Sequence, residues 1–127
     1  MNQAKTSFEE LSKKLDAFDK ERDWIGLDPA DLAKSIVLEA AELLELYQWD
    51  NSLTKRGKDI PAKDKQKIAF EVADILIYLL KFCRESKIDI VDATLQKLEK
   101  VGKKYPAGSH PVHDAEEYLK IKKAHRN

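Results

Sequence analysis

The chain has 127 residues, with 23 Lys and Arg against 23 Asp and Glu, and 43% of its residues are hydrophobic. This length fits a single domain. A net charge of zero argues against binding nucleic-acid polymers by neutralising their phosphates, because such domains are normally basic. The longest wholly apolar run near the centre of the chain, Ile75 to Leu80, is too short to cross a bilayer. We therefore expect neither a nucleic-acid polymer nor a membrane as a partner.

The amino-terminal residues and the cysteine count point to a compartment. The first ten residues contain no continuous apolar segment of the kind that a signal peptide needs, so we expect a cytoplasmic protein. The single cysteine, Cys83, excludes an internal disulfide and a thiolate zinc cluster. We expect its thiol to be buried in the core.

Capping signals predict where the first two helices begin. Thr6 and Ser7 are each followed three residues later by a glutamate, which is the capping-box arrangement. Four apolar residues at helical spacing predict a buried stripe on this first helix, namely Phe8, Leu11, Leu15 and Phe18. The second helix should begin at Asp28-Pro29, because the aspartate can cap the first amides and proline fits the first turn, and it should run to about Trp49.

The remaining elements are also helical. The third helix should start near Asp64 and end at about Ser86, and the fourth should run from Asp89 to between Gly102 and Tyr105. A short fifth helix could start at Asp114. The sequence therefore predicts an all-α, four-helix bundle-like domain over residues 1–106, followed by a carboxy-terminal tail over residues 107–127.

The second and third predicted helices are apolar on more than one face. A lone four-helix unit in water would not need such wide apolar surfaces. A subunit interface would cover them, so we expect a homodimer or a homotetramer.

The most informative feature is a pair of acids on each of these two apolar helices. Glu39 and Glu42 are three residues apart on the second helix, and Glu71 and Asp74 are three residues apart on the third. Each pair therefore lies on one helix face and borders apolar residues. Removing a carboxylate from water costs several kcal/mol. The four groups must be solvated, protonated, paired with bases or gathered around a cation.

The sequence favours a bound cation over the other three options but does not exclude pairing with bases. Lys67 can reach Glu71 one turn along, and Lys81 lies on the same side as Asp74, so ion pairing stays an alternative. If the second and third helices pair as a hairpin, the two acidic pairs would face each other across a narrow gap. Four oxygen ligands in this arrangement instead favour magnesium. A di-iron carboxylate site would need Glu-x-x-His on two helices. It is excluded because all three histidines lie beyond the fourth helix, at His110, His113 and His125.

The sequence segments around the acids resemble those of a known family. The segments that carry the resemblance are Glu21-Arg-Asp-Trp24, Leu38-Glu-Ala-Ala-Glu-Leu-Leu-Glu45, Tyr47-Gln-Trp49, Glu71-Val-Ala-Asp74, Asp74-Ile-Leu-Ile-Tyr78 and Lys104-Tyr-Pro106. In order and approximate spacing they are similar to the MazG-like all-α nucleoside triphosphate pyrophosphohydrolases, in the small single-domain branch that includes dCTP pyrophosphatases. The resemblance covers about residues 8–106. It implies a MazG-type fold and Mg²⁺-dependent cleavage between the α and β phosphates of a nucleotide.

The resemblance also implies roles for individual residues. The metal ligands would be Glu39, Glu42, Glu71 and Asp74, and the residues near the nucleotide would be Trp24, Trp49, Tyr78, Lys97 and Lys104. Our candidate for the carboxylate that orients or deprotonates the attacking water is Glu42. As alternatives, the two tryptophans could be core or interface residues, and the two lysines could be solvated groups near a helix end.

Two departures from the family pattern concern substrate selection. The loop Gly26-Leu27-Asp28-Pro29 is one residue shorter than in many relatives and lacks their His-x-Pro stretch. Val101 stands where many relatives have an asparagine four residues before the Tyr-Pro pair. Both departures weaken the case for dCTP specificity and leave the metal chemistry untouched.

We therefore expect a pyrophosphohydrolase that acts on deoxynucleoside triphosphates, cytosine-containing or modified ones among them. Two alternatives stay open. The first is a non-enzymatic helical dimerisation module, in which Lys67, Lys81 and lysines of the connection between the second and third helices neutralise the acids. The second is a related pyrophosphohydrolase that acts on phosphoribosyl-ATP.

Overall fold

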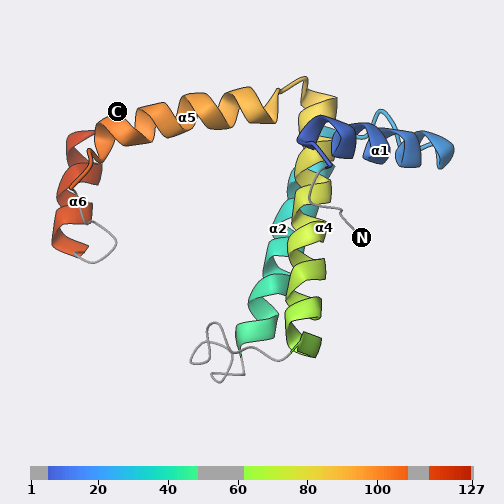
Figure 1. The fold of residues 1–127 in the computed structure, drawn as a ribbon, viewed down its shortest axis with the longest axis horizontal. Coiled ribbons are helices and arrows are strands. Elements are labelled where there is room, and N and C mark those ends of the chain that lie inside the picture. The colour runs from blue at the N-terminus through green and yellow to red at the C-terminus, as the bar shows by residue number, and fades with distance from the viewer. Residues whose placement is uncertain (1–5, 49–61, 109–114, 127) are drawn as a thin grey trace. The chain divides into compact units, whose positions relative to one another are not determined.

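The computed structural model describes residues 6–48, 62–108 and 115–126 of the chain. The described residues form helices and contain no strand, so the all-α prediction is confirmed (Figure 1). The chain divides into two compact units, Met1–Ile88 and Asp89–Asn127. The first unit contains α1 (Phe8–Glu21), α2 (Pro29–Gln48) and α4 (Ala62–Ser86), and the second contains α5 (Ile90–Lys104) and α6 (Ala115–Ala124).

Helix α1 begins where the sequence predicts. The hydroxyl of Ser7 accepts a hydrogen bond from the backbone N–H of Glu10 at 3.1 Å, which satisfies one of the free amides of the first turn. The chain leaves the helix through two residues with positive φ, Asp23 at 57° and Gly26 at 76°. Aspartate and glycine tolerate this left-handed region better than most residues, which lets the loop turn towards α2.

Helices α2 and α4 run side by side and antiparallel (Figure 1). The Asp28 carboxylate accepts from the N–H of Ala30 at 2.9 Å, and Pro29 occupies the first helical position. Helix α4 begins at Ala62, two residues before the predicted start, and ends at Ser86 as expected. The two helices that carry the acidic pairs therefore form one packed pair.

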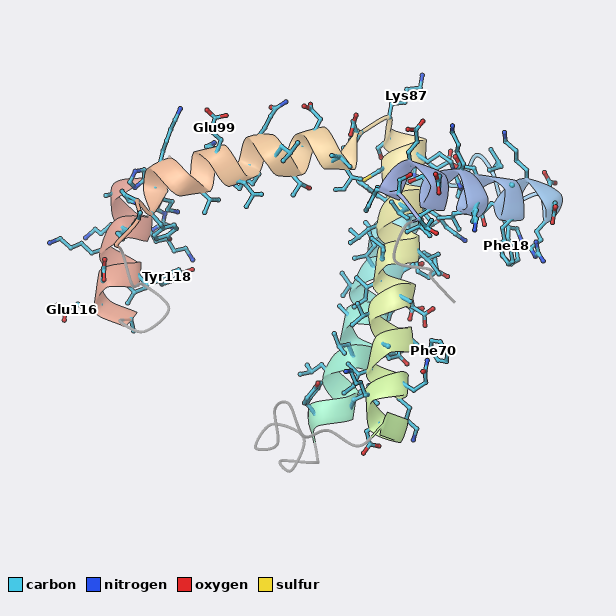
Figure 2. The ribbon with its side chains drawn as sticks, viewed as in Figure 1. Phe18, Phe70, Lys87, Glu99, Glu116 and Tyr118 are labelled. Atoms are coloured by element: carbon cyan, nitrogen blue, oxygen red, sulfur yellow. The ribbon has the colours of Figure 1, made fainter. Side chains whose placement is uncertain are left out.

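Few apolar side chains of the described residues are buried. They are Leu32, Leu80 and Cys83, which are 2%, 7% and 7% exposed. The expectation that Cys83 is a core thiol is confirmed, and burial raises the pKa of that thiol. Large apolar side chains on α2 and α4 are exposed, among them Phe70, which projects from α4 in Figure 2.

The predicted burial of the apolar stripe on α1 is wrong for three of its four residues. Phe8, Leu11 and Phe18 are 39%, 38% and 46% exposed, and Leu15 is half-buried. The reason is that α1 does not close onto α4. An open apolar groove of about 450 Å³ lies between the two helices, lined mainly by Leu11, Leu15, Phe18, Ala73, Leu76, Ile77 and Leu80.

The second unit follows its local signals. The Asp89 carboxylate caps α5 by accepting from the N–H of Asp92 at 3.0 Å, as its predicted start requires. The rings of Tyr105 and Tyr118 are stacked, with their centres 6.4 Å apart. The short fifth helix is present as α6, and its predicted first residue lies outside the described ranges. Among the described helices, none combines the length and hydropathy that crossing a bilayer requires.

Candidate metal centre

The two acidic pairs meet between α2 and α4. Glu39 and Glu42 from α2 and Glu71 and Asp74 from α4 each contribute one carboxylate oxygen to a group whose members lie within 4.8 Å of one another. The three-residue spacing keeps each pair on one face of its helix, and the packing of α2 against α4 brings those faces together. We call these four residues the acid quartet.

The acid quartet is an unfavourable arrangement when it holds no cation. Glu39, Glu71 and Asp74 are half-buried, whereas Glu42 is exposed. Loss of water and then the neighbouring Glu42 raise the pKa of Glu39 and of Glu71. One oxygen of Glu39 and one of Glu71, Oε2 in each case, are buried without a hydrogen-bond partner among the described residues. Such buried acceptors are rare unless a proton, a water or an ion satisfies them.

Ion pairing with lysine does not neutralise the quartet within the described part of the chain. Lys81 Nζ lies 3.4 Å from Asp19 Oδ1, so the predicted alternative in which it pairs with Asp74 is wrong. Lys67 forms no ion pair with Glu71, whose buried oxygen has no partner. The lysine side chains of the connection between α2 and α4 lie outside the described residues.

The residues present fit a hard divalent cation. The donors are four carboxylates, with no thiol or imidazole among them, and oxygen donors of this kind are the preferred ligands of Mg²⁺ and Ca²⁺. A cation would also satisfy the two orphaned oxygens and offset the crowding of like charges. The cluster can therefore hold a metal that binds phosphate oxygens.

Two of the aromatic site candidates lie against one ammonium group. Lys81 Nζ is 5.1 Å from the ring centre of Trp24 and 5.3 Å from that of Tyr78. Tyr78 is one helical turn beyond Asp74 on α4. Trp24 belongs to the loop between α1 and α2, and it is 45% exposed, with the Phe18 ring edge-on and the two ring centres 6.1 Å apart.

Two of the other candidates belong to the second unit, and one lies outside the described residues. Lys97 and Lys104 lie on α5 in the second unit, where Lys97 is exposed and Lys104 is half-buried. The ammonium of Lys104 lies 5.4 Å from the ring centre of its neighbour Tyr105. Trp49 lies outside the described residues.

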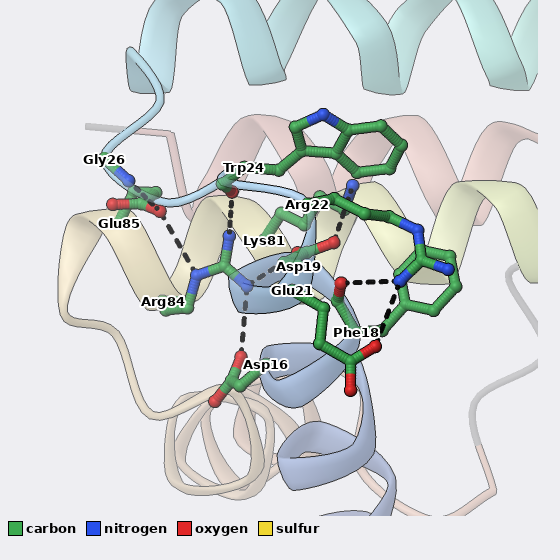
Figure 3. Close-up of polar contacts among 10 residues, drawn as sticks. All are labelled: Asp16, Phe18, Asp19, Glu21, Arg22, Trp24, Gly26, Lys81, Arg84 and Glu85. Carbon is green, nitrogen blue, oxygen red and sulfur yellow. Dashed lines mark hydrogen bonds and ion pairs between the residues drawn. The ribbon is translucent and has the colours of Figure 1, made fainter.

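The sequence analysis missed a polar cluster beside Trp24. Arg84 Nη1 donates to Asp19 at 2.8 Å and to Asp16 at 3.1 Å, and its Nε donates to Glu85 at 3.1 Å (Figure 3). The side chain of Asp19 is fully buried. One signal was available, because Asp19 follows Leu15 by four residues and so lies at the edge of the apolar stripe of α1.

Comparisons with known proteins place these features in a family. The model of the MazG-like family matches residues 34–120. The chain is 29% identical to mouse dCTP pyrophosphatase 1 over 101 residues, covering 79% of this chain and 59% of that protein. It is 28% identical to human dCTP pyrophosphatase 1 over 102 residues, covering 80% and 60%. The chain thus spans about three fifths of the length of the curated relatives it matches.

A solved structure gives the same result. The crystal structure of a pyrophosphatase from Archaeoglobus fulgidus superposes with a TM-score of 0.68 at 39% sequence identity, covering 77% of this chain and 91% of that one. The family match covers well over half of the chain and includes all four members of the acid quartet. The chain therefore belongs to the MazG-like family.

Proposed function

We propose that this protein is a Mg²⁺-dependent pyrophosphohydrolase that converts deoxynucleoside triphosphates, dCTP or modified nucleotides among them, to a monophosphate and pyrophosphate. The observation that carries the proposal is the acid quartet, with four carboxylate oxygens within 4.8 Å and two buried oxygens that lack partners. The names of the relatives, dCTP pyrophosphatase 1 and a pyrophosphatase, support a nucleotide as the substrate.

All four members of the acid quartet would hold the metal, namely Glu39, Glu42, Glu71 and Asp74. When bound, Mg²⁺ supplies positive charge for the phosphate oxygens and the leaving pyrophosphate, and it makes a bound water more acidic. The packing of α2 against α4 keeps the quartet's oxygens near one another before the substrate arrives. Ligands held in place in advance favour binding of a cation, and that cation can then offset the negative charge of a polyphosphate.

Glu42 is the member of the quartet that we assign to the attacking water. Its side chain is exposed while the other three are half-buried, so it can contact water at the edge of the cluster. The oxygen of that water bonds to phosphorus, the bridging bond between the α and β phosphates breaks, and the Glu42 carboxylate takes the proton. Pyrophosphate leaves with the electron pair of the broken bond.

Aromatic and basic residues complete the proposed nucleotide site. The indole of Trp24, which is 45% exposed, together with Trp49, would stack on the base, and Tyr78 lies one turn beyond Asp74 on α4. Lysine ammonium groups are suited to phosphate oxygens, and Lys97 and Lys104 are our candidates for that contact.

We also propose that the working form is a homodimer or a homotetramer. Five large apolar side chains of α2 and α4 are between 50% and 68% exposed, namely Val37, Leu38, Leu44, Phe70 and Val72. A second copy of the chain could cover this apolar surface, and wide exposed apolar patches typically mark interfaces.

Pyrophosphate release tests the enzymatic proposal. The purified protein is incubated with each common deoxynucleoside triphosphate and with modified cytosine nucleotides, in millimolar Mg²⁺ or with excess chelator. We expect pyrophosphate and monophosphate only in the Mg²⁺ samples. Absence of product above the chelator control would contradict the proposal and favour the dimerisation module. Preferred turnover of phosphoribosyl-ATP in a competition assay would instead support the related pyrophosphohydrolase.

A further inference from the structure

The loop between α1 and α2 is held mainly by polar contacts. Two of its three apolar side chains, Trp24 and Ile25, are 45% and 41% exposed, and the third, Leu27, is half-buried. Two of its residues, Asp23 and Gly26, adopt positive φ, so the loop follows a defined path. A segment with so little buried apolar surface depends on its hydrogen bonds for a fixed position. Those hydrogen bonds therefore fix the backbone from which the Trp24 side chain extends, while the indole itself contacts the Phe18 ring, edge-on with ring centres 6.1 Å apart, and Lys81.

The hydrogen bonds from this loop to α4 converge on two adjacent residues, Arg84 and Glu85. Arg84 Nη2 donates to the backbone oxygen of Trp24 at 3.3 Å. The backbone N–H of Gly26 donates to Glu85 Oε2 at 3.0 Å, and Arg84 Nε donates to the same oxygen at 3.1 Å (Figure 3). Arg84 thus contacts the loop directly and also orients the acceptor that holds the loop's second point.

The same guanidinium is fixed from the α1 side. It donates to Asp16 and to the fully buried Asp19, and only 18% of the Arg84 side chain is exposed. Burial alone would lower the pKa of Arg84, but its hydrogen bonds to the three carboxylates outweigh burial and raise it. The planar fork of arginine can serve all these acceptors at once, whereas a lysine ammonium cannot.

Asp19 connects this arrangement to Lys81 on α4. Its second oxygen lies 3.4 Å from Lys81 Nζ, and that nitrogen faces the rings of both Trp24 and Tyr78. The Lys81 side chain is 9% exposed, so its ammonium is confined between these groups. The position of the indole is therefore coupled to the helix that carries Glu71 and Asp74.

We propose that Arg84 is a positioning residue for base recognition, which holds Trp24 in place through the Trp24 carbonyl, Glu85 and Asp19 without touching the substrate. This inference rests on the proposed function for the identity of the ligand. The coupling of Arg84 to the Trp24 indole rests only on the contacts within this chain.

The first test is spectroscopic and needs no turnover. Because the chain has two tryptophans, a Trp49→Phe background leaves Trp24 as the single indole. In that background, Arg84→Lys keeps a positive charge beside Asp19 but removes the fork, and Glu85→Ala removes the acceptor for Gly26. Both should shift the Trp24 emission to the red and increase its quenching by acrylamide.

Arg126→Lys is the matched control for this test. Arg126 is an exposed arginine that follows α6 in the second unit, so its replacement should leave the Trp24 emission unchanged. Thermal unfolding shows which variants are folded. If one of the two test variants does not fold, the other decides the outcome.

The second test is kinetic and retains Trp49. For Arg84→Lys we expect KM for the preferred nucleotide to rise about tenfold and kcat to stay within about twofold, with reduced discrimination between bases. A purely structural role would lower the active fraction for every base alike. Folded test variants with unchanged emission and unchanged base preference would overturn the proposal. Altered emission in a protein whose parent hydrolyses no nucleotide would overturn the proposed function and support the positioning of Trp24.

Discussion

At the scale of single residues, the four members of the acid quartet differ in what surrounds them. Three are half-buried, and two of these have an oxygen without a partner, whereas Glu42 is exposed. A half-buried carboxylate is suited to hold a metal, because its geometry is fixed by the surrounding side chains. An exposed one can contact a water at the edge of the cluster, and contact with the attacking water is what a general base requires.

Replacing Glu42 with glutamine tests whether this carboxylate is essential. We expect Glu42→Gln to reduce turnover by at least about a hundredfold, because the amide can neither take a proton nor neutralise the metal. The metal-free variant should unfold at a slightly higher temperature than the parent, since one of four crowded charges is gone. Initial rates and thermal melts in chelator measure both effects.

Asp31→Asn is the matched control for Glu42→Gln. Asp31 is an exposed acid in the first turn of the same helix, where it pairs with Lys34 at 3.7 Å. Its replacement should change neither the rate nor the melting temperature appreciably. Undiminished turnover of Glu42→Gln would exclude Glu42 from any essential role.

At the scale of helices, apolar packing holds α2 and α4 together, while the like charges of the acid quartet repel one another. The packing of the pair brings two acids from each helix within 4.8 Å. A cation bound at this point would cross-link the two helices. The stability of the pair should therefore depend on divalent metal more than on ionic strength.

Thermal unfolding in Mg²⁺ tests this cross-link. At a concentration a hundred times the dissociation constant, a ligand specific for the folded state adds about 2.7 kcal/mol of stability. We expect Mg²⁺ to raise the melting temperature, and NaCl of equal ionic strength to have little effect. The Glu71→Gln, Asp74→Asn double variant should lose the Mg²⁺ response. A response of equal size in that variant would show that the ion binds elsewhere.

The contact of α1 with α4 depends on charge instead. Arg84→Met would leave the buried Asp19 with Lys81 as its remaining cation, so we expect a loss of about 3–5 kcal/mol in the free energy of unfolding. Lys13→Met is the control, because Lys13 and Glu9 form an exposed pair whose loss should cost at most about 1 kcal/mol. Urea unfolding measures both, and equal small losses would contradict this account.

At the scale of the whole molecule, the described residues bury few large apolar side chains and expose many. The exposed ones include side chains along both α2 and α4. A small domain with so limited a core is stabilised effectively by association, because the interface supplies the missing apolar burial.

A charge placed on this surface tests the oligomer. Phe70 is 64% exposed on α4, so Phe70→Lys removes no core contact but would place a charge in an interface. Sedimentation equilibrium should give a mass of two or four chains for the parent and a smaller mass for Phe70→Lys. A parent that sediments at 14.6 kDa at micromolar concentration would contradict the proposed oligomer.

Local signals determined most of the secondary structure. Ser7, Asp28 and Asp89 each cap a helix as predicted, because a capping bond joins residues only two or three positions apart. The 3.6-residue periodicity of an α-helix indicated that Glu39 and Glu42 share a face, as do Glu71 and Asp74. It also predicted that a hairpin of the two helices could bring the four acids together. The sequence by itself therefore determined the helices and the candidate site.

Tertiary structure alone decided which side chains far apart in the chain meet. Asp19 and Arg84 are separated by 65 positions, and no local pattern pairs them. Lys81 lies on the same side of its helix as Asp74, but the packing of α1 brings Asp19 to 3.4 Å from its ammonium. Periodicity shows that the α1 stripe is apolar, but it cannot show how closely a neighbouring helix approaches. That approach depends on how side chains from separate elements fit together, and this is settled only when the chain is folded.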